Sequence, residues 1–243
     1  MSRELPDPVA ALLLDLDGTL VDTEYLHFES AIQVLAVEGI SLRPGDLLPY
    51  VGWAELPFWH DLKARFRLRP PAEELLQRRA VAYVALVHGR RIDPLPGVRE
   101  LLHWAVAQAL PCAVASSSPR ALIQASLRAS GLDELLTVYR SGHEDAARGK
   151  PEPDVYHAAA AAIGVRAEDC VALEDSPTGA RSARAAGAFT IALPCPSHPA
   201  PLQALAMADL LLADALQALD FLRARARLAR SNAAAKTSPK RST

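Results

Sequence analysis

The stretch DLDGTL, Asp15 to Leu20, follows directly on the apolar run ALLL of residues 11–14. Two aspartates stand two residues apart beside a glycine, at the end of a segment typical of a buried strand. A carboxylate is costly to hold near an apolar interior unless a partner compensates its charge. The two aspartates therefore either face water on a turn or lie next to a positive group.

Four further short apolar runs resemble the first: CAVAS (112–116), CVALED (170–175), FTIAL (189–193) and DLLLA (209–213). Continuous apolar runs of this length are typical of strands in a parallel sheet that is covered on both faces. Helical stretches lie between them, and several begin at a proline and end at a glycine, which is the expected helix asymmetry. The alternation predicts an α/β fold with a doubly wound, Rossmann-like parallel sheet.

The segment from residue 23 to residue 93 has a different pattern. It lacks strand-like runs and carries helical patterns such as HFESAIQVLAVEG (27–39) and PAEELLQRRAVAYVALV (71–87). We therefore predict a small helical domain at residues 23–93, inserted after the first strand. The main domain is then discontinuous and consists of residues 1–22 and 94–222.

The charge of the 243-residue chain is unevenly distributed. The net charge is −2, but residues 223–243 hold seven basic residues and no acid, and we expect this tail to be disordered. The remainder has 19 basic and 28 acidic residues, a balance that tolerates a divalent cation and disfavours nucleic acid.

Targeting signals and disulfides are not indicated. The sequence shows no signal peptide and no apolar stretch of membrane-spanning length, and Cys112, Cys170 and Cys195 have no disulfide or metal spacing. His198 likewise has no ligand spacing. We expect a cytoplasmic protein, monomeric by default, with no nucleic-acid or membrane partner.

Polar groups follow three of the expected strands, at the sheet edge where ligands of open α/β folds bind. The strand-end groups are Asp15 and Asp17, Ser116 to Ser118, and Glu174 and Asp175. Lys150, in the segment GKPEPD, can reach the same edge. Clustered carboxylates repel one another unless a cation joins them, and Mg²⁺ prefers oxygen ligands. Lysine and serine suit phosphate oxygens, and an aspartate can act as a nucleophile or as a general acid and base. The set therefore predicts phosphoryl transfer.

Four ordered segments resemble the motifs of the haloacid dehalogenase superfamily: DLDGTLVDTE (15–24), ASSS (115–118), GKPEPDVY (149–156) and LEDSPTGARSARAAG (173–187). They cover nearly all of the main domain. The helical insertion resembles the cap of the branch that holds phosphoglycolate phosphatase, β-phosphoglucomutase and sugar-phosphate phosphatases. The resemblance implies a Mg²⁺-dependent phosphatase that acts through an aspartyl-phosphate. Its expected substrate is a small phosphorylated metabolite, and a sugar phosphate is favoured.

The resemblance also implies roles for individual residues. Asp15 would be the nucleophile and a metal ligand. Asp17 would be the general acid and base, with its backbone carbonyl on the metal. Ser116 would hydrogen-bond the transferring phosphoryl group, and Lys150 would neutralise both that group and Asp15.

Further residues have secondary roles in this interpretation. Asp175 would bind Mg²⁺, Glu174 would bind it directly or through water, and Thr19 would orient the loop. Glu174 could equally be a charge at a strand end with no ligand role. The substrate would be contacted by residues of the cap and of the serine segment: Glu24, His27, Gly52, Arg79 and Ser117. Arg79 could instead be a surface residue with no contact to the substrate.

Three alternatives remain open at this stage. A hexose-phosphate mutase would need a cap site for a second phosphate, and this chain has Glu55 where the mutase resembled here has an arginine. A haloacid dehalogenase would leave Asp17 unexplained, and a receiver domain would lack the helical insertion. Trp53, Phe58 and Trp59 could line the substrate pocket or pack inside the cap.

Overall fold

The computed structural model describes residues 3–51, 53 and 55–229 of the chain. These residues form a six-stranded, all-parallel sheet with the order β3-β2-β1-β4-β5-β6. The strands are β1 (Ala11–Leu14), β2 (Cys112–Ser116), β3 (Tyr139–Ser141), β4 (Cys170–Glu174), β5 (Phe189–Ala192) and β6 (Leu210–Leu211). Since β1 lies between β2 and β4, Asp15 leaves the sheet at its middle.

The predicted α/β class with a parallel sheet is confirmed, and the five apolar runs all form strands. Two details differ from the sequence prediction. Strand β3 was not predicted, because it is a three-residue edge strand, YRS, with two half-buried side chains and no apolar run. Strand β6 is reduced to two residues at the opposite edge.

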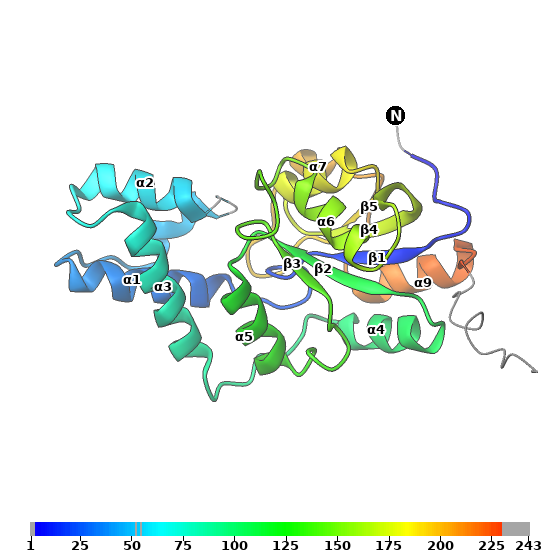
Figure 1. Ribbon diagram of the computed structural model, residues 1–243, viewed down its shortest axis with the longest axis horizontal. Coiled ribbons are helices and arrows are strands. Elements are labelled where there is room, and N and C mark those ends of the chain that lie inside the picture. Colours follow the sequence, from blue (N-terminus) through cyan, green and yellow to red (C-terminus); the bar gives the residue numbers. More distant parts are fainter. Residues whose placement is uncertain (1–2, 52, 54, 230–243) are drawn as a thin grey trace, which may run out of the picture.

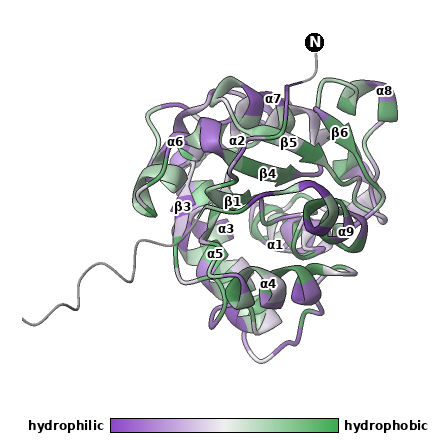
Figure 2. Ribbon diagram, turned by 90° about the vertical axis from the view of Figure 1, so that its right-hand side faces the viewer, coloured by the Kyte–Doolittle hydropathy of each residue, from purple (hydrophilic) through white to green (hydrophobic). Residues whose placement is uncertain are grey.

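Helices cover both faces of the sheet (Figure 1). One face packs against α4 (Val98–Ala107), α5 (Arg120–Ser130) and α9 (Ala215–Arg225), and the other against α6 (Asp154–Ala162) and α7 (Pro177–Ala185). Figure 2 shows the apolar strands enclosed between these layers. Along β1, Leu12 and Leu14 join one core while Ala11 and Leu13 join the other, as the alternation of a strand requires.

Three short elements complete the main sheet region. These are η2 (Ala167–Asp169), α8 (Leu202–Leu205) and the αL turn at Gly131 that ends α5. Helix α7 begins at Pro177, and the Ser176 hydroxyl accepts a hydrogen bond from the Gly179 backbone N–H at 3.0 Å. This cap fixes the start of α7 immediately after the acidic end of β4.

A helical unit follows β1 and consists of α1 (Glu24–Val37), the 3₁₀ helix η1 (Pro44–Tyr50), α2 (Glu55–Phe66) and α3 (Ala72–Val87). It has its own hydrophobic core and stands at the left of Figure 1. Its two connections to the sheet region lie side by side, since Val21 and Pro94 form an antiparallel bridge. The Tyr83 hydroxyl of α3 lies 2.8 Å from the Ser126 hydroxyl of α5, which joins the unit to the core. The domain limits at 23 and 93 stay a prediction.

The predicted start of a disordered tail at residue 223 is wrong for residues 223–229. Helix α9 continues to Arg225, the Arg227 Nε lies 3.1 Å from Asp7 Oδ1, and Leu228 forms a parallel bridge with Val9. Apolar side chains of α9 dock on the sheet and extend order past the point where the basic residues begin. The rest of the predicted tail lies outside the described residues.

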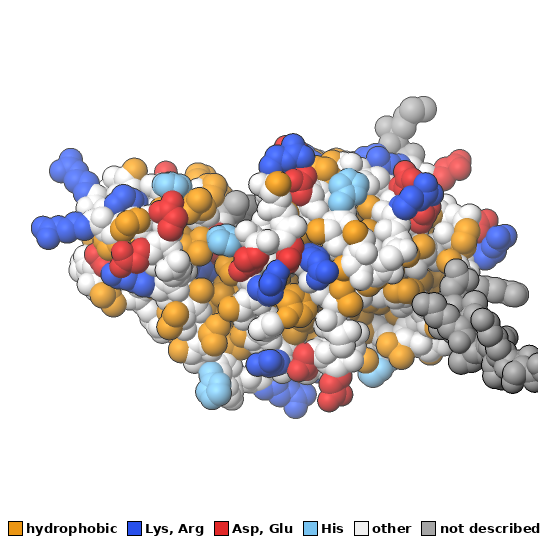
Figure 3. Space-filling model, in the orientation of Figure 1, with side chains coloured by type: hydrophobic (Ala, Val, Ile, Leu, Met, Phe, Trp, Pro, Cys, Tyr) orange, Lys and Arg blue, Asp and Glu red, His pale blue; other side chains and the backbone are white. Residues whose placement is uncertain are grey.

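Surface and length features bear on the expected partners. On the face shown in Figure 3, acidic and basic side chains are interspersed. Within the described part of the chain, every helix is too short or too polar to span a membrane. The expectations of a monomer and of no nucleic-acid partner stay predictions.

Candidate active site

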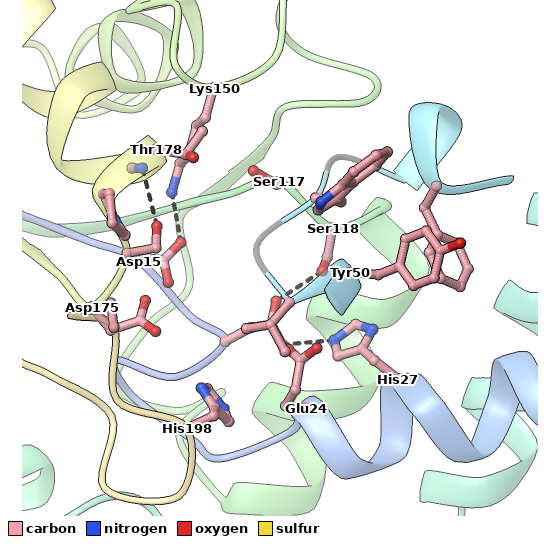
Figure 4. Close-up of a pocket in the computed structure, with 18 of the residues that line it drawn as sticks. Asp15, Glu24, His27, Tyr50, Ser117, Ser118, Lys150, Asp175, Thr178 and His198 are labelled. Atoms are coloured by element: carbon pink, nitrogen blue, oxygen red, sulfur yellow. Dashed lines mark hydrogen bonds and ion pairs between the residues drawn. The ribbon is translucent and has the colours of Figure 1, made fainter. Parts of the chain in front are cut away.

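A cavity of about 500 Å³ lies between the carboxyl ends of the central strands and the helical unit. The residues of the sheet region that line this cavity include Asp15, Asp17, Ser117, Ser118, Lys150 and Asp175. Figure 4 shows the Asp15 and Asp175 side chains facing the same space, with Lys150 beside Asp15. The sheet therefore brings together residues separated by up to 160 positions, because parallel strands end at one edge.

Lys150 is the cation of a buried acidic cluster. Its Nζ lies 2.6 Å from Asp15 Oδ1 and 2.6 Å from Glu174 Oε1, and its side chain is 5% exposed. The Tyr156 hydroxyl donates to the same Glu174 oxygen at 2.7 Å, and the Ser176 hydroxyl donates to Glu174 Oε2 at 3.2 Å. Both oxygens of Glu174 thus accept hydrogen bonds from protein donors, and its role as a metal ligand stays a prediction.

The cluster carries more negative than positive charge. Burial raises the pKa of Asp15 to about 7, repulsion from Glu174 adds to the rise, and Lys150 offsets part of it. Burial and the charge of Asp15 likewise raise the pKa of Asp175 well above its usual range. Burial alone would lower the pKa of Lys150, but its two carboxylate partners raise it above its usual range. A second cation would relieve this imbalance.

The donor set fits the Mg²⁺ that the family resemblance implies. Oxygens of Asp15, Glu174 and Asp175 lie within 4.8 Å of one another. Carboxylate oxygens are the ligands that this hard cation prefers. Asp15, Glu174 and Asp175 are therefore the side chains placed to hold the ion. A contact from the Asp17 backbone carbonyl stays a prediction.

Gly18 and Thr19 hold the loop after β1, which follows Asp15 and Asp17, against Asp175. Gly18 has φ +91°, and a Cβ at this position would stand 2.3 Å from Asp175 Oδ2. Thr19 donates its hydroxyl hydrogen to Asp175 Oδ1 at 3.4 Å. A side chain at position 18 would therefore push the two parts of the cluster apart.

We expect Gly18→Ala to lower kcat/KM for the phosphatase reaction expected from the sequence by about 100-fold, since a displacement near 1 Å in a catalytic set has costs of this order. The matched control is Gly89→Ala, because Gly89 has φ +75° and a Cβ added there would meet no atom within 4 Å. Both variants carry the backbone strain of a positive φ, so equal loss of activity would contradict the steric argument.

Asp17 is held by the helical unit and by the serine segment. Its Oδ1 accepts from the Thr23 hydroxyl at 2.5 Å and lies 3.1 Å from His27 Nε2, while its Oδ2 accepts from the Ser118 hydroxyl at 2.8 Å. Burial alone would raise the pKa of Asp17, but the interactions with His27 and the hydroxyls hold it well below its usual range. Asp17 is therefore ionised in this arrangement.

The three serines after β2 have different places. Ser116 is fully buried, its hydroxyl lies 3.3 Å from Asp17 Oδ2, and it accepts from the Ser118 N–H at 3.0 Å. Ser117 and Ser118 line the cavity, and Ser116 is absent from its described lining. Ser117 and Ser118 are thus further candidates for the phosphoryl contact assigned to Ser116, which stays a prediction. The run ASSS alone could not distinguish them, because the choice depends on where β2 ends.

Arg79 is buried in the cavity wall, at 5% exposure, and does not occupy the surface position left open from the sequence. Its Nη1 lies 2.5 Å from Glu55 Oε2, and its Nη2 contacts His27 Nδ1. A continuous chain of contacts thus runs from Glu55 through Arg79 and His27 to Asp17. The sequence showed these residue types but not their connection, since α1, α2 and α3 each supply one member.

Aromatic and acidic side chains complete the wall formed by the helical unit. Trp53 and Phe58 line the cavity, whereas Trp59 is fully buried in the core of the unit. Glu24 also lines the cavity, and burial raises its pKa. Gly52, predicted to contact the substrate, lies outside the described residues.

A loop after β5 contributes a group that sequence reasoning missed. His198 lines the cavity, and its Nε2 lies 3.5 Å from Cys195 Sγ. The hydrogen bond with Cys195 raises the pKa of His198 to about 9. Burial would raise the pKa of Cys195, but the hydrogen bonds with His198 and Ser197 lower it overall.

The fold and the site define a class: parallel α/β proteins with a carboxylate and lysine cluster at the carboxyl edge of the sheet. The chain belongs to the haloacid dehalogenase-like hydrolases, because the model of that family matches residues 9–187. The family predicted from the four motifs is thereby confirmed.

Two relatives of the chain carry the name of a phosphatase. The chain is 32% identical over 202 residues to validoxylamine A 7'-phosphate phosphatase of Streptomyces hygroscopicus subsp. limoneus, a match that covers 83% of this chain and 92% of the relative. It is 32% identical over 193 residues to hexitol phosphatase B of Escherichia coli (strain K12), with coverage of 79% and 86%. Among solved structures, it resembles a mutant of CbbY from Rhodobacter sphaeroides in complex with xylulose-(1,5)bisphosphate. That match has a TM-score of 0.73 at 27% identity and covers 85% of this chain and 94% of the other.

Proposed function

We propose that this protein is a Mg²⁺-dependent phosphatase that hydrolyses a small phosphorylated metabolite, a sugar or polyol monophosphate, through an aspartyl-phosphate. The observation that carries the proposal is the buried Asp15–Lys150 pair, 2.6 Å apart at the floor of a cavity that the helical unit covers. We propose that this unit, predicted at residues 23–93, serves as the cap of the site. The two related phosphatases support the reaction class.

In the first step, an oxygen of Asp15 attacks phosphorus and the bond from phosphorus to the leaving oxygen breaks. Lys150 balances the charge of the attacking carboxylate and of the phosphoryl oxygens. Ser117 and Ser118 also line the cavity, where their hydroxyl and backbone groups can orient the phosphoryl group. Mg²⁺, held by Asp15 and Asp175, would supply further charge neutralisation when bound.

Asp17 carries the proton of the reaction, and His27 Nε2 holds its carboxylate in place from 3.1 Å. Since Asp17 is ionised in the arrangement described, it takes up a proton from solvent before the bond to the leaving oxygen breaks. Asp17 then delivers this proton to the leaving group. In the second step, Asp17 accepts a proton from the water that attacks the aspartyl-phosphate, and inorganic phosphate is released.

The cavity wall favours a leaving group that carries no second phosphate. Among the described residues that line the cavity, the arginine is Arg79 and the lysine is Lys150. Arg79 is paired with Glu55 and Lys150 with Asp15. Glu24 and Glu55 add negative charge on the side of the helical unit, while Trp53 and Phe58 offer apolar faces for a sugar ring. A mutase would need a cation free to hold the second phosphate, so the Glu55–Arg79 pair counts against that alternative.

Assay of phosphate release from a panel of substrates tests the proposal directly. We expect hexose, pentose and polyol monophosphates to be turned over with Mg²⁺, and chelation with EDTA to reduce the rate by at least about 100-fold, because the phosphoryl charge then lacks its cation. Readdition of Mg²⁺ should restore the rate. Equal rates with and without the chelator would remove the metal from the mechanism. Conversion of hexose 1-phosphate to hexose 6-phosphate without release of phosphate would establish the mutase instead.

We expect Glu55→Gln to shift the preference toward a substrate with a second anionic group, because it leaves the Arg79 charge without its partner. The ratio of kcat/KM for a sugar bisphosphate to that for the monophosphate should rise by about 10-fold, which corresponds to about 1.4 kcal/mol. Glu38→Gln is the control. Glu38 Oε1 lies 2.7 Å from Arg78 Nη1, and neither residue is among the described residues that line the cavity. An unchanged ratio in Glu55→Gln would show that the pair does not govern specificity.

A further inference from the structure

A second group of possible metal ligands lies at the rim of the cavity. It consists of Asp22, Cys195 and His198, whose donor atoms all lie within 4.8 Å of one another. The His198 Nε2 lies 3.5 Å from Cys195 Sγ and 3.6 Å from Asp22 Oδ1. This group shares no residue with the cluster of Asp15, Glu174 and Asp175.

The spacing of these atoms matches the edges of a tetrahedral metal site. With bond lengths of about 2.3 Å to sulfur and about 2.0–2.2 Å to nitrogen and oxygen, tetrahedral geometry places sulfur and nitrogen about 3.5 Å apart and nitrogen and oxygen about 3.4 Å apart. The two observed separations lie within a few tenths of an ångström of these values. His198 Nε2 therefore already stands at ligand spacing from both of the other side chains, whose donor atoms lie within 4.8 Å of each other.

The loop that carries two of the ligands is restrained by its sequence. In PCPSHPAP, residues 194–201, four prolines flank Cys195 and His198 and restrict the backbone around them. His198 Nδ1 is buried without a hydrogen-bond partner among the described residues, which leaves Nε2 as the nitrogen that faces the other two side chains. A site whose ligands are held in place before binding loses less entropy on taking up a ligand.

We propose that Asp22, Cys195 and His198 form a second metal site, for a thiophilic divalent cation such as Zn²⁺. A thiolate, an imidazole and a carboxylate are a donor set for this class of ion, whereas the all-oxygen catalytic cluster suits Mg²⁺. The Cys195 thiol gives up its proton to solvent as the metal–sulfur bond forms. Three protein ligands leave the fourth position for water.

Access and position give the site a consequence. Cys195 is 1% exposed, but His198 lines the cavity and the Asp22 side chain is 34% exposed, so an ion can reach the group past these two side chains. Asp22 lies in the connection that leads from β1 into α1, two residues before the helical unit begins. A bound ion joins this connection to the loop after β5, and thus restrains the helical unit at the mouth of the cavity.

Titration of the full-length, metal-free protein with Co²⁺ in an excess of Mg²⁺ tests the proposal without relying on turnover. Co²⁺ reports a thiolate ligand by a charge-transfer absorption band in the near ultraviolet. We expect one equivalent of Co²⁺ to produce this band, together with the visible bands of a tetrahedral site, and Zn²⁺ to abolish both. The band should persist in Asp15→Asn, so failure of the catalytic proposal would leave this result unaffected.

Matched variants assign the ligands. Cys195→Ser and His198→Gln should each weaken Co²⁺ binding by at least about 100-fold, since loss of a ligand exceeds the 10- to 100-fold effect typical of a supporting residue. Cys112→Ser and His60→Gln, whose side chains lie outside the group, should bind Co²⁺ as the wild type does. Thermal unfolding without metal establishes that each variant is folded. A wild-type protein without the charge-transfer band, or a band that survives in Cys195→Ser, would overturn the proposal.

Discussion

Replacement of Asp15 by asparagine should abolish phosphate release and leave the protein at least as stable as the wild type. Loss of a nucleophile from a catalytic set has costs of about 10⁴- to 10⁶-fold in kcat, and we expect a decrease of at least about 10⁴-fold here. The amide preserves the size of the side chain but cannot form the aspartyl-phosphate. Steady-state assay of phosphate release with the best substrate of the panel measures the loss.

The stability part of this prediction follows from the pKa of Asp15. Burial and Glu174 raise this pKa from 3.8 to about 7 in the folded protein without metal. The folded state therefore holds the Asp15 proton more tightly than the unfolded state, and its stability contribution is lost as the pH rises from about 3.8 to about 7. Asparagine has no charge to desolvate, so the stability difference in favour of Asp15→Asn should grow between pH 5 and pH 8.

Thermal unfolding in the absence of Mg²⁺, at both pH values, measures this difference. Asp220→Asn is the control, since Asp220 is an exposed residue of α9 far from the cavity lining. It should alter neither turnover nor the pH dependence of unfolding. Full activity of Asp15→Asn would disprove the nucleophile assignment. A variant that is inactive and also much less stable would show that Asp15 serves the fold and would refute the charge argument.

Replacement of Lys150 by alanine should remove activity and destabilise the fold together. Lys150 is 5% exposed in its side chain and contacts both Asp15 and Glu174 at 2.6 Å. Its loss leaves buried carboxylates without a counter-charge, and removing one partner from a buried ion pair typically costs about 3–5 kcal/mol. Chemical denaturation with urea, without Mg²⁺, measures the decrease in the free energy of unfolding.

A double variant separates the two effects of Lys150. In Lys150→Ala/Glu174→Gln the excess negative charge is reduced, so we expect part of the lost stability to return while activity remains absent. The coupling between the two positions follows from the complete double-mutant cycle. Stability losses that simply add would show that the two side chains do not interact. Recovery of activity in the double variant would contradict the role of Lys150 in neutralising the phosphoryl group.

The family and the fold class could be predicted from the sequence because the features that indicate them lie in short, continuous segments. Each motif is a short segment whose residue types reflect one strand end or one helix start, as in DLDGTL after the apolar run of β1 and in LEDSPTG, which runs from the end of β4 into the start of α7. Apolar runs of four or five residues predict strands by themselves. Strand β3 escaped prediction because its polar residues form a strand only through pairing with β2.

The environment of each site residue could not be predicted from the sequence, since it depends on contacts between segments that are distant in the chain. Whether Ser116 or Ser118 faces the cavity, whether Arg79 is buried against Glu55, and whether Cys195 and His198 meet Asp22 are decided by how helices and loops pack. The sequence by itself determined a parallel α/β hydrolase with paired aspartates after the first strand and an accompanying lysine. Only the tertiary structure decided which charges are compensated, because burial and separation in space, rather than residue type, set the electrostatic free energy of each group.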